Sequence, residues 1–392
     1  EKRVAKLRLE PARRIASILA IDNCSATNKE ESIKYAELAR LLLHKAQHLH
    51  EQHHEICPYT KKQVSIGLIR FAHTKNIIEV IKSMYEQQIN NDTVHFHLCC
   101  YHARQLLILR NAMETKLDRI LNRNKENALF EHSEIQDALA KSPAKNHIFI
   151  VISSPVSEVG RDHDYDWAIV EPSSMRSIIQ LAGRIWRHRP HKIPQTPNIA
   201  ILNRNLRALK KGNEIAFERP GFESKPKFPL ANHNIETLIP EEQLNPINAI
   251  PRIQKQQDLQ PKTRLADLEH AVIAHTLNNP RPNHINTFWK AGLSHPFWVQ
   301  LQLISPFRQQ DVQQTEYVCL PDDGSDTGFS FIPSDSAWKH HDISQAKTVN
   351  YHIVFSPFKP DNTAASPWLT SDFNEELEKL AEERGKDTLT TA

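Results

Sequence analysis

Short apolar runs recur along the first half of the chain, and segments with helical spacing separate them. VSIGLIRFA (64–72) is a continuous apolar run, typical of a parallel strand buried on both faces. Similar runs predict further strands at 93–100, 147–153, 167–172 and 198–203. Amphipathic spacing predicts helices at about 74–88 and 104–122. Strands that alternate with helices predict a doubly wound α/β lobe with an all-parallel sheet, in which ligands bind at the carboxyl ends of strands.

The remaining patterns divide the chain into four parts. Residues 1–57 have helical spacing and predict a helical segment that leads into a lobe at 58–211. Prolines are dense and apolar periodicity is weak at 212–282, which predicts a linker with one short helix near 263–277. From 283 to 392 we expect a small α+β domain. Its predicted elements are a hairpin of TEYVCLP and GFSFIP around DDGSDT, a third strand TVNYHIVF and a final helix FNEELEKLAEER.

Histidine and cysteine give no clear metal site. Histidines gather between His44 and His54 without a fixed ligand geometry, so we interpret them as a solvated helix face. The five cysteines lack CxxC spacing, which favours thiols in a reducing cytosol over a zinc site. No run reaches membrane-spanning length or resembles a signal peptide, so we expect a cytoplasmic protein with no membrane partner. Because the chain begins with Glu1 rather than Met, we expect it to be part of a longer protein.

The most informative segment, 151–189, predicts a strand, a loop, a second strand and a helix. On that helix Gln180, Arg184 and Arg187 fall at i, i+4 and i+7, which would place them on one face. Gly183 would let another backbone or a ligand approach closely. Two arginines one turn apart would suit the binding of a polyphosphate. This is the arrangement of the arginine fingers of a nucleic-acid motor.

Charge is distributed unevenly along the chain. The formal net charge of +3 does not by itself demand a nucleic-acid partner, but 176–211 holds nine Lys/Arg and no acidic residue. We therefore expect basic surface beside the arginines, where a phosphate backbone could lie.

Half of a nucleotide site is missing from the sequence. There is no GxxxxGK[ST] phosphate loop and no DExH-like acidic box after a strand. A nucleoside triphosphate site needs such a loop and a carboxylate for magnesium. The chain therefore supplies only the arginine half, and we expect another domain to supply the rest.

These residues carry a family resemblance. VSEVGRDHDYD resembles motif V of superfamily 2 helicases, and QLAGRIWRHR matches the motif VI pattern Q-x-x-G-R-x-x-R. The run 158–189 closely resembles the CRISPR-associated helicase–nuclease of type I systems, type I-F in particular, and the similarity extends upstream through IGLIRFAHT and CCYHARQLLILR. The resemblance implies a RecA-like second helicase lobe of an enzyme that degrades target DNA while translocating on single strands with ATP. The chain would be its C-terminal portion.

The family resemblance also implies cofactors and partners. ATP and magnesium would occupy a site completed by a first RecA-like lobe, and a divalent transition metal would bind only in an HD nuclease domain. A Cas-two-like segment, the HD domain and the first lobe would all precede this chain. The partners would be single-stranded target DNA, a type I-F RNA-guided surveillance complex and the CRISPR adaptation integrase.

Carried over by motif, the resemblance gives roles to residues near the nucleotide. Arg184 and Arg187 would contact the ATP phosphates across the lobe interface, and Gln180 would lie near the γ-phosphate. Gly160 and Asp162 would form the turn that reaches the nucleotide, with the Asp162 carboxylate at a ribose hydroxyl. A surface salt bridge is the alternative for the two arginines.

Residues at two strand ends would contact DNA. Ser153 and Ser154 stand where motif V meets the DNA backbone, and His102 and Arg104 resemble the motif IVa contact. Capping of the strand end is the alternative for the two serines.

Other signals have simpler interpretations. The pairs His163–Asp164 and His341–Asp342 lack the further ligands of an HD site. We interpret the tryptophans of the C-terminal domain (Trp289, Trp298 and Trp338) as a small core rather than a base-stacking row. Two alternative functions stay open: another superfamily 2 DNA helicase, or a non-catalytic fragment that binds DNA or the surveillance complex.

Overall fold

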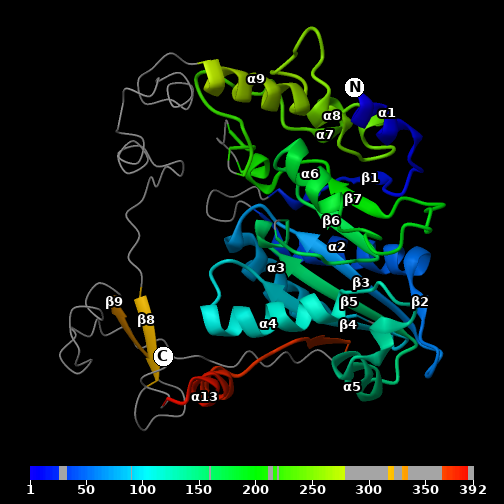
Figure 1. Ribbon diagram of the computed structural model, residues 1–392, viewed down its shortest axis with the longest axis vertical. Helices are drawn as coiled ribbons and strands as arrows, with labels where there is room; N and C mark the ends of the chain where they lie inside the picture. Colours follow the sequence, from blue (N-terminus) through cyan, green and yellow to red (C-terminus); the bar gives the residue numbers. More distant parts are fainter. Residues whose placement is uncertain are drawn as a thin grey trace. The chain divides into compact units, whose positions relative to one another are not determined.

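A computed structural model describes most of the chain (Figure 1). The described residues are 1–25, 33–89, 91–158, 160–210, 215–218, 220–278 and 364–386, with the backbone of 317–321 and 329–333. They fall into two compact units, one of residues 1–275 with 360–370, and one of 276–359 with 371–392.

An eight-stranded sheet forms the centre of the first unit, in the order β1-β7-β6-β3-β5-β4-β10, with β2 beside β3. The strands are β1 Ala16–Leu19, β2 Glu55–Ile56, β3 Gln63–Arg70, β4 Val94–Tyr101, β5 Asn146–Ser153, β6 Trp167–Val170, β7 Ile199–Leu202 and β10 Ala365–Pro367. Every pairing is parallel except that of the two-residue β2 with β3. The predicted α/β lobe is therefore confirmed, and the prediction of an all-parallel sheet is wrong only at β2.

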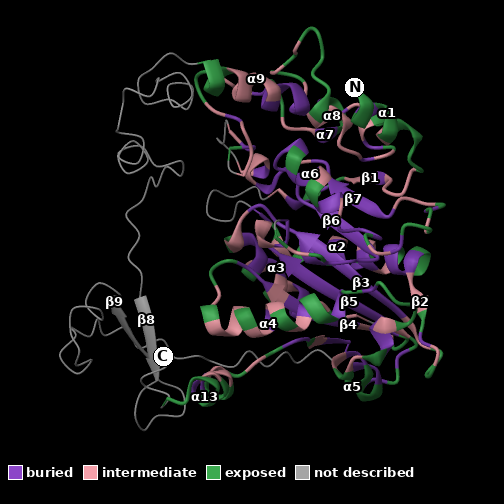
Figure 2. Cartoon of the chain, viewed as in Figure 1, coloured by how far each residue is buried: buried purple, intermediate pink, exposed green. Residues whose placement is uncertain are grey.

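Helices cover both faces of this sheet, as expected for a doubly wound fold. The helices of eight or more residues in this unit are α1 Lys2–Leu9, α2 Tyr35–His53, α3 Thr74–Glu86, α4 Leu107–Ile120, α5 Ser133–Lys141, α6 Met175–Ala182 and α9 Leu265–Asn278. Side chains of α2 and α3 share one core with Ile69 and Phe71 of the β3 segment. Side chains of α4, α5 and α6 share the other core with Ile66 and Leu68 of β3. Figure 2 shows the central strands as the most deeply buried layer.

Short helical turns complete the chain. They are η1 Asp22–Cys24, η2 Ala128–Glu131, η3 Pro155–Ser157, η4 Leu206–Leu209, α7 Ile235–Leu238, η5 Glu241–Gln243 and α8 Ile250–Ile253. None of the helices in the described part of the chain is both long and apolar enough to cross a bilayer.

The N-terminal segment departs from the predicted helical structure. Strand β1 interrupts it and pairs with β7, a partner some 180 positions away in the sequence. Four residues are too few for their periodicity to distinguish a strand from a helix, so only the neighbouring strand decides the conformation. The solvated histidine face is also wrong in part, because His50 and His53 are buried. His50 Nδ1 lies 2.8 Å from Ser65 Oγ, and His53 Nε2 donates to the Pro197 carbonyl at 3.1 Å.

The proline-rich segment packs onto the lobe. Phe217, Leu230 and Leu238 are buried in the same core as α4, α5 and α6. The buried carboxylate of Glu223 accepts hydrogen bonds from the backbone N–H groups of Ala216, Phe217 and Leu230, which holds this irregular segment in place. The predicted short helix is confirmed as α9.

The second unit contains the predicted hairpin and final helix. Strands β8 Tyr317–Pro321 and β9 Phe329–Pro333 pair antiparallel, and α13 spans Phe373–Arg384. The third predicted strand (348–355), the three tryptophans and the pair His341–Asp342 lie outside the described residues.

Candidate functional site

The helix that carries Gln180 ends before the two arginines. Ser174 caps its start, since the Ser174 hydroxyl oxygen accepts a 3.0 Å hydrogen bond from Ser177 N. Helix α6 ends at Ala182, and Ile185 then pairs with Tyr165 in an isolated parallel bridge. Tyr165 N donates to the Arg184 carbonyl at 2.9 Å, and Trp186 N donates to the Tyr165 carbonyl at 3.1 Å. The prediction of one helical face is therefore wrong, because the bridge uses peptide groups that a longer helix would need.

Arg184 turns inward and binds the preceding loop. Its Nη2 donates to the Glu158 carbonyl at 2.9 Å, and its Nη1 donates to the Arg161 carbonyl. Its Nε is buried without a hydrogen-bond partner in the described part of the chain. Burial, together with nearby Arg187, lowers the pKa of the Arg184 guanidinium. Arg184 thus holds the motif V loop against the motif VI segment.

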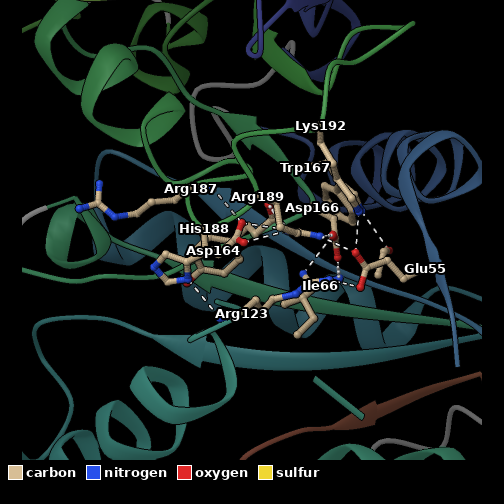
Figure 3. A network of polar contacts seen from close by, with 12 residues as sticks. Glu55, Ile66, Arg123, Asp164, Asp166, Trp167, Arg187, His188, Arg189 and Lys192 are labelled. Atoms are coloured by element: carbon tan, nitrogen blue, oxygen red, sulfur yellow. Dashed lines mark hydrogen bonds and ion pairs between the residues drawn. The ribbon is translucent and has the colours of Figure 1, made fainter. Parts of the chain in front are cut away.

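Arg187 is the arginine that solvent can reach. Its side chain is 44% exposed and its Nε binds Asp162 Oδ1; the Asp162 side chain is 69% exposed. The hydrogen bond from Arg187 lowers the pKa of the Asp162 carboxyl. Arg187 and Asp162 therefore form an accessible ion pair, and Figure 3 shows the Arg187 side chain extending away from the buried residues behind it.

The other residues predicted near the nucleotide lie on the loop that carries Asp162 or at the end of α6. Gly160 is exposed with φ +74°, a conformation that favours glycine, and it precedes Asp162 in the turn. Gln180 is exposed on the last turn of α6. A Cβ at Gly183 would lie 3.1 Å from the Gln180 carbonyl, so the backbone nearest to it is its own preceding turn.

A buried ionic network fixes the backbone on which Arg187 stands (Figure 3). Arg189 binds both oxygens of Asp164, with Nε–Oδ2 at 2.8 Å and Nη2–Oδ1 at 2.9 Å. Its Nη1 lies 2.6 Å from Asp166 Oδ1 and 2.8 Å from Glu55 Oε1. Asp164 Oδ1 also accepts a 3.1 Å hydrogen bond from Arg187 N. We call the set Glu55, Arg123, Asp164, Asp166 and Arg189 the arginine clamp.

Arg123, which follows the end of α4, completes the arginine clamp. Its Nη1 lies 3.0 Å from Asp166 Oδ1 and its Nη2 lies 2.6 Å from Glu55 Oε2. Burial alone would raise the pKa of Asp166, but Arg123 and Arg189 outweigh it and hold that pKa below its usual value. Burial likewise opposes Arg123 and Arg189 at Glu55, whose pKa falls to about 2. The carboxyl groups of Asp166 and Glu55 are therefore ionised throughout the neutral range.

Sequence reasoning missed the arginine clamp as a functional feature. Its signal in the sequence was an aspartate at every second position just before β6. The carboxylates of Asp164 and Asp166 are buried, and that of Asp162 is exposed. Arg189 follows the motif VI pattern by two residues. Glu55 and Arg123 come from distant segments and carried no signal.

A second buried network holds the start of the motif V loop. Arg70 Nη2 lies 2.5 Å from Glu158 Oε1 and donates to Ser177 Oγ at 3.1 Å. The Ser177 hydroxyl donates to Glu158 Oε2 at 2.9 Å. This network joins the end of β3, the loop and the first turn of α6.

His163 is occupied by its neighbours. Its Nε2 lies 2.8 Å from Asp118 Oδ1 and its Nδ1 lies 3.1 Å from Tyr165 Oη. Burial lowers its pKa to about 4 despite Asp118. Asp164 binds Arg189 instead, so His163 and Asp164 serve different partners. Within the described ranges no group of three or more His, Cys, Asp or Glu is arranged to hold a metal ion.

The four predicted DNA-contacting residues meet at the carboxyl ends of two adjacent strands. Tyr101 of β4 is in register with Ser153 of β5, and Ser154 N donates to the Tyr101 carbonyl at 3.1 Å. Ser153 is buried, with its Oγ 2.7 Å from Ser157 Oγ, and the Ser154 hydroxyl is also buried.

His102 and Arg104 follow Tyr101 directly. His102 is buried and its Nδ1 accepts a 3.2 Å hydrogen bond from Arg104 N. Burial, then the charge of Arg104, lowers the pKa of His102. Arg104 alone among the four DNA-contact candidates is exposed.

Much of the predicted basic surface is neutralised. Arg189 lies in the arginine clamp, and Lys192 lies 2.6 Å from Glu55. Arg204 lies 2.7 Å from Asp22, and Arg207 lies 2.9 Å from Glu218. The excess of basic residues at 176–211 is therefore offset by carboxylates from other segments.

Comparisons with known proteins identify the family. Residues 63–190 match the family described as CRISPR-associated nuclease/helicase Cas3, C-terminal. Two relatives named CRISPR-associated nuclease/helicase Cas3 subtype I-F/YPEST are each 36% identical. The match to the Pectobacterium atrosepticum protein covers 92% of this chain and 34% of that protein. The match to the Pseudomonas aeruginosa protein covers 97% of this chain and 34% of that protein.

A crystal structure of T. fusca Cas3-ATP is 14% identical over 50% of this chain and 19% of that chain, with a TM-score of 0.34. The chain spans about a third of the length of the two I-F/YPEST relatives. The chain therefore belongs to the CRISPR-associated nuclease/helicase Cas3 family, subtype I-F/YPEST, and corresponds to a C-terminal portion of such a protein.

Proposed function

We propose that this chain is the second RecA-like helicase lobe, with its C-terminal extension, of an ATP-dependent DNA translocase and nuclease of CRISPR interference. The observation that carries the proposal is the placement of Arg187. Its exposed guanidinium stands on a backbone that the buried arginine clamp fixes. An accessible charge on a fixed backbone suits an arginine finger, because preorganised charge stabilises a transition state without a reorganisation cost.

The proposal assigns the nucleotide roles by motif. Arg187 contacts the ATP phosphates across the lobe interface, Arg184 holds the loop that carries Asp162, and Gln180 lies near the γ-phosphate. Asp162 pairs with Arg187 in the absence of nucleotide. When nucleotide binds, the Asp162 carboxylate accepts a hydrogen bond from a ribose hydroxyl, and Gly160 allows the turn that places it there. Magnesium and the phosphate loop come from the first lobe, since the sequence holds no phosphate loop of its own.

The proposal places single-stranded DNA at the ends of β4 and β5. Arg104 provides the accessible charge there, and the buried groups of His102, Ser153 and Ser154 shape the turn that presents it. The proposed partners of the whole enzyme are a type I-F RNA-guided surveillance complex and the CRISPR adaptation integrase. The proposed location is the cytoplasm.

The test is Arg187→Lys in the intact nuclease/helicase. Lysine keeps the charge but loses the planar fork that meets two phosphate oxygens. Loss of an arginine finger costs on the order of a thousandfold in turnover. We expect DNA-stimulated ATP hydrolysis and translocation to be lost, while ATP still binds and single-stranded DNA is still nicked.

The matched control is Arg40→Lys, at an exposed arginine of α2 that pairs with Glu37. It should hydrolyse ATP at the unaltered rate. Near wild-type translocation by Arg187→Lys would show that Arg187 is a structural residue and would overturn the proposed role.

A further inference from the structure

Arg14 lies in a fixed position at the amino end of β1. Its carbonyl accepts a 2.9 Å hydrogen bond from Ile247 N. On either side of it, Ile15 N donates to Asn198 Oδ1 at 3.0 Å and Asn198 Nδ2 donates to the Arg13 carbonyl at 2.9 Å. The backbone at Arg14 is therefore tied to β7 and to the packed proline-rich segment.

The sheet topology brings Arg14 toward the arginine clamp. Strand β7 lies between β1 and β6, and all three run parallel. Arg14 precedes β1 and Asp164 precedes β6, so both lie at the amino-terminal edge of the same part of the sheet. Arg187 is bound to Asp164 through its backbone, so it belongs to that edge as well.

The Arg14 guanidinium has no partner there. Its Nε is buried without an acceptor, and no described residue gives this guanidinium a hydrogen bond or an ion pair. Burial, the charge of neighbouring Arg13 and the charge of Arg187 lower the pKa of Arg14 to about 10, against the opposing effects of Glu10 and Asp164.

The local charges leave an excess of donors around Arg187. Asp162 pairs with Arg187, and both oxygens of Asp164 bind Arg189. Arg184, three positions before Arg187, and Arg14, at the same edge of the sheet, each hold a buried Nε with no acceptor among the described residues. An anion with several oxygens would satisfy such donors, whereas a single carboxylate would not.

We propose that Arg14 is a third guanidinium of this site and binds a phosphate group of the same nucleoside triphosphate that Arg187 contacts. The inference rests on the proposed function, because that function places the triphosphate beside Arg187. It adds a residue from outside motifs V and VI, on a segment that neither motif would identify.

The first experiment measures the accessibility of Arg14 in the unaltered full-length nuclease/helicase. Phenylglyoxal modifies exposed guanidinium groups, and peptide mass spectrometry reports each arginine separately. We expect the non-hydrolysable analogue AMP-PNP with magnesium to protect Arg14 and Arg187 severalfold. Arg40, exposed on α2 and paired with Glu37, should react equally with and without the analogue.

The second experiment measures the affinity of the intact enzyme for a fluorescent AMP-PNP derivative. Arg14→Ala should weaken binding at least tenfold, and Arg14→Lys should recover part of the loss. Arg13→Ala is the neighbouring control, since Arg13 lies 3.9 Å from Glu10, and it should bind within twofold of the unaltered enzyme.

The outcomes separate this inference from the proposed function. Protection of Arg187 without protection of Arg14, with full affinity in Arg14→Ala, would overturn the third guanidinium and leave the finger intact. Failure to protect either arginine would overturn both. Because the modification experiment uses unaltered protein, it decides the question even if Arg14→Ala does not fold.

Discussion

Asp164 grips Arg189 through both carboxylate oxygens, at 2.8 and 2.9 Å, and with one of those oxygens it also accepts the backbone N–H of Arg187. One buried carboxylate therefore couples the end of the motif VI segment to the residue that we propose as the finger. The coupling explains how an arginine beyond the end of a helix can keep a defined position.

Asp164→Asn should destabilise the first unit. The amide cannot bind Arg189 bidentately and leaves part of a buried charge unpaired; breaking a buried pair in this way costs about 3 kcal/mol or more. Urea unfolding followed by circular dichroism measures the change. Glu37→Gln, which breaks the exposed pair with Arg40, should leave the free energy of unfolding nearly unchanged, because solvent screens an exposed pair. Equal effects of the two substitutions would refute the importance of the clamp.

Gly67→Ala should be poorly tolerated. Gly67 of β3 is in register with Trp167 of β6, and a Cβ at Gly67 would lie 2.1 to 2.3 Å from the Trp167 ring. Overpacking of this kind costs about 1–3 kcal/mol or more. Combining Gly67→Ala with Trp167→Leu should recover part of the loss in thermal unfolding. Additive effects of the two substitutions would show that they do not share a contact.

A chain of neutral histidines fastens β10 to the edge of the sheet. His147 Nε2 donates to the Ala144 carbonyl at 3.0 Å, so its Nδ1 accepts from His97 Nε2 at 2.9 Å. His97 Nδ1 then faces Ser366 Oγ of β10 at 3.4 Å, and His95 Nε2 lies 2.9 Å from the same oxygen. A proton on His147 Nδ1 would face the N–H group of His97 Nε2. Two donors cannot share a hydrogen bond, so this contact would be lost.

This histidine chain predicts a loss of stability in acid. Burial, then the charge of Lys62, lowers the pKa of His147 to about 4, against 6.5 for an ordinary histidine, and burial also lowers that of His97. A depressed pKa means that the unfolded state binds protons first. The histidines' contribution is therefore complete above pH 6.5 and is lost as the pH falls toward 4.

Hydrogen exchange of the β10 amides as a function of pH measures this effect. Exchange should accelerate below pH 6.5 relative to the amides of β3. Substitution of the exposed His44 should leave the profile unchanged. A β10 protection that does not vary between pH 7 and pH 5 would contradict the prediction.

Arg104→Ala in the intact enzyme should weaken binding of single-stranded DNA and flatten its salt dependence by about one ion, because one phosphate contact is lost. Fluorescence anisotropy over a series of salt concentrations gives the slope. Arg40→Ala removes the same charge from α2 and should leave the slope as it was. An unchanged slope in Arg104→Ala would show that Arg104 does not contact a DNA phosphate.

The central strands of the lobe and the helices between them follow from the amino-acid pattern, because continuous apolar runs and helical spacing are local signals. Strands β3 to β7, the hairpin β8–β9 and helix α13 lie where the pattern predicted them. The motif spacing likewise singled out Arg187 and Asp162, but these residues are 25 positions apart, and the bridge between Tyr165 and Ile185 brings their segments together.

Tertiary structure decided what depends on distant partners. Strand β1 exists because β7 pairs with it, and α6 stops at Ala182 because Ile185 pairs with Tyr165. The arginine clamp takes Glu55 from β2 and Arg123 from beyond α4, and neither residue has a local signal of its role. Whether a charged side chain is paired, buried or available depends on which segments the fold brings beside it, and that is information a sequence pattern does not hold.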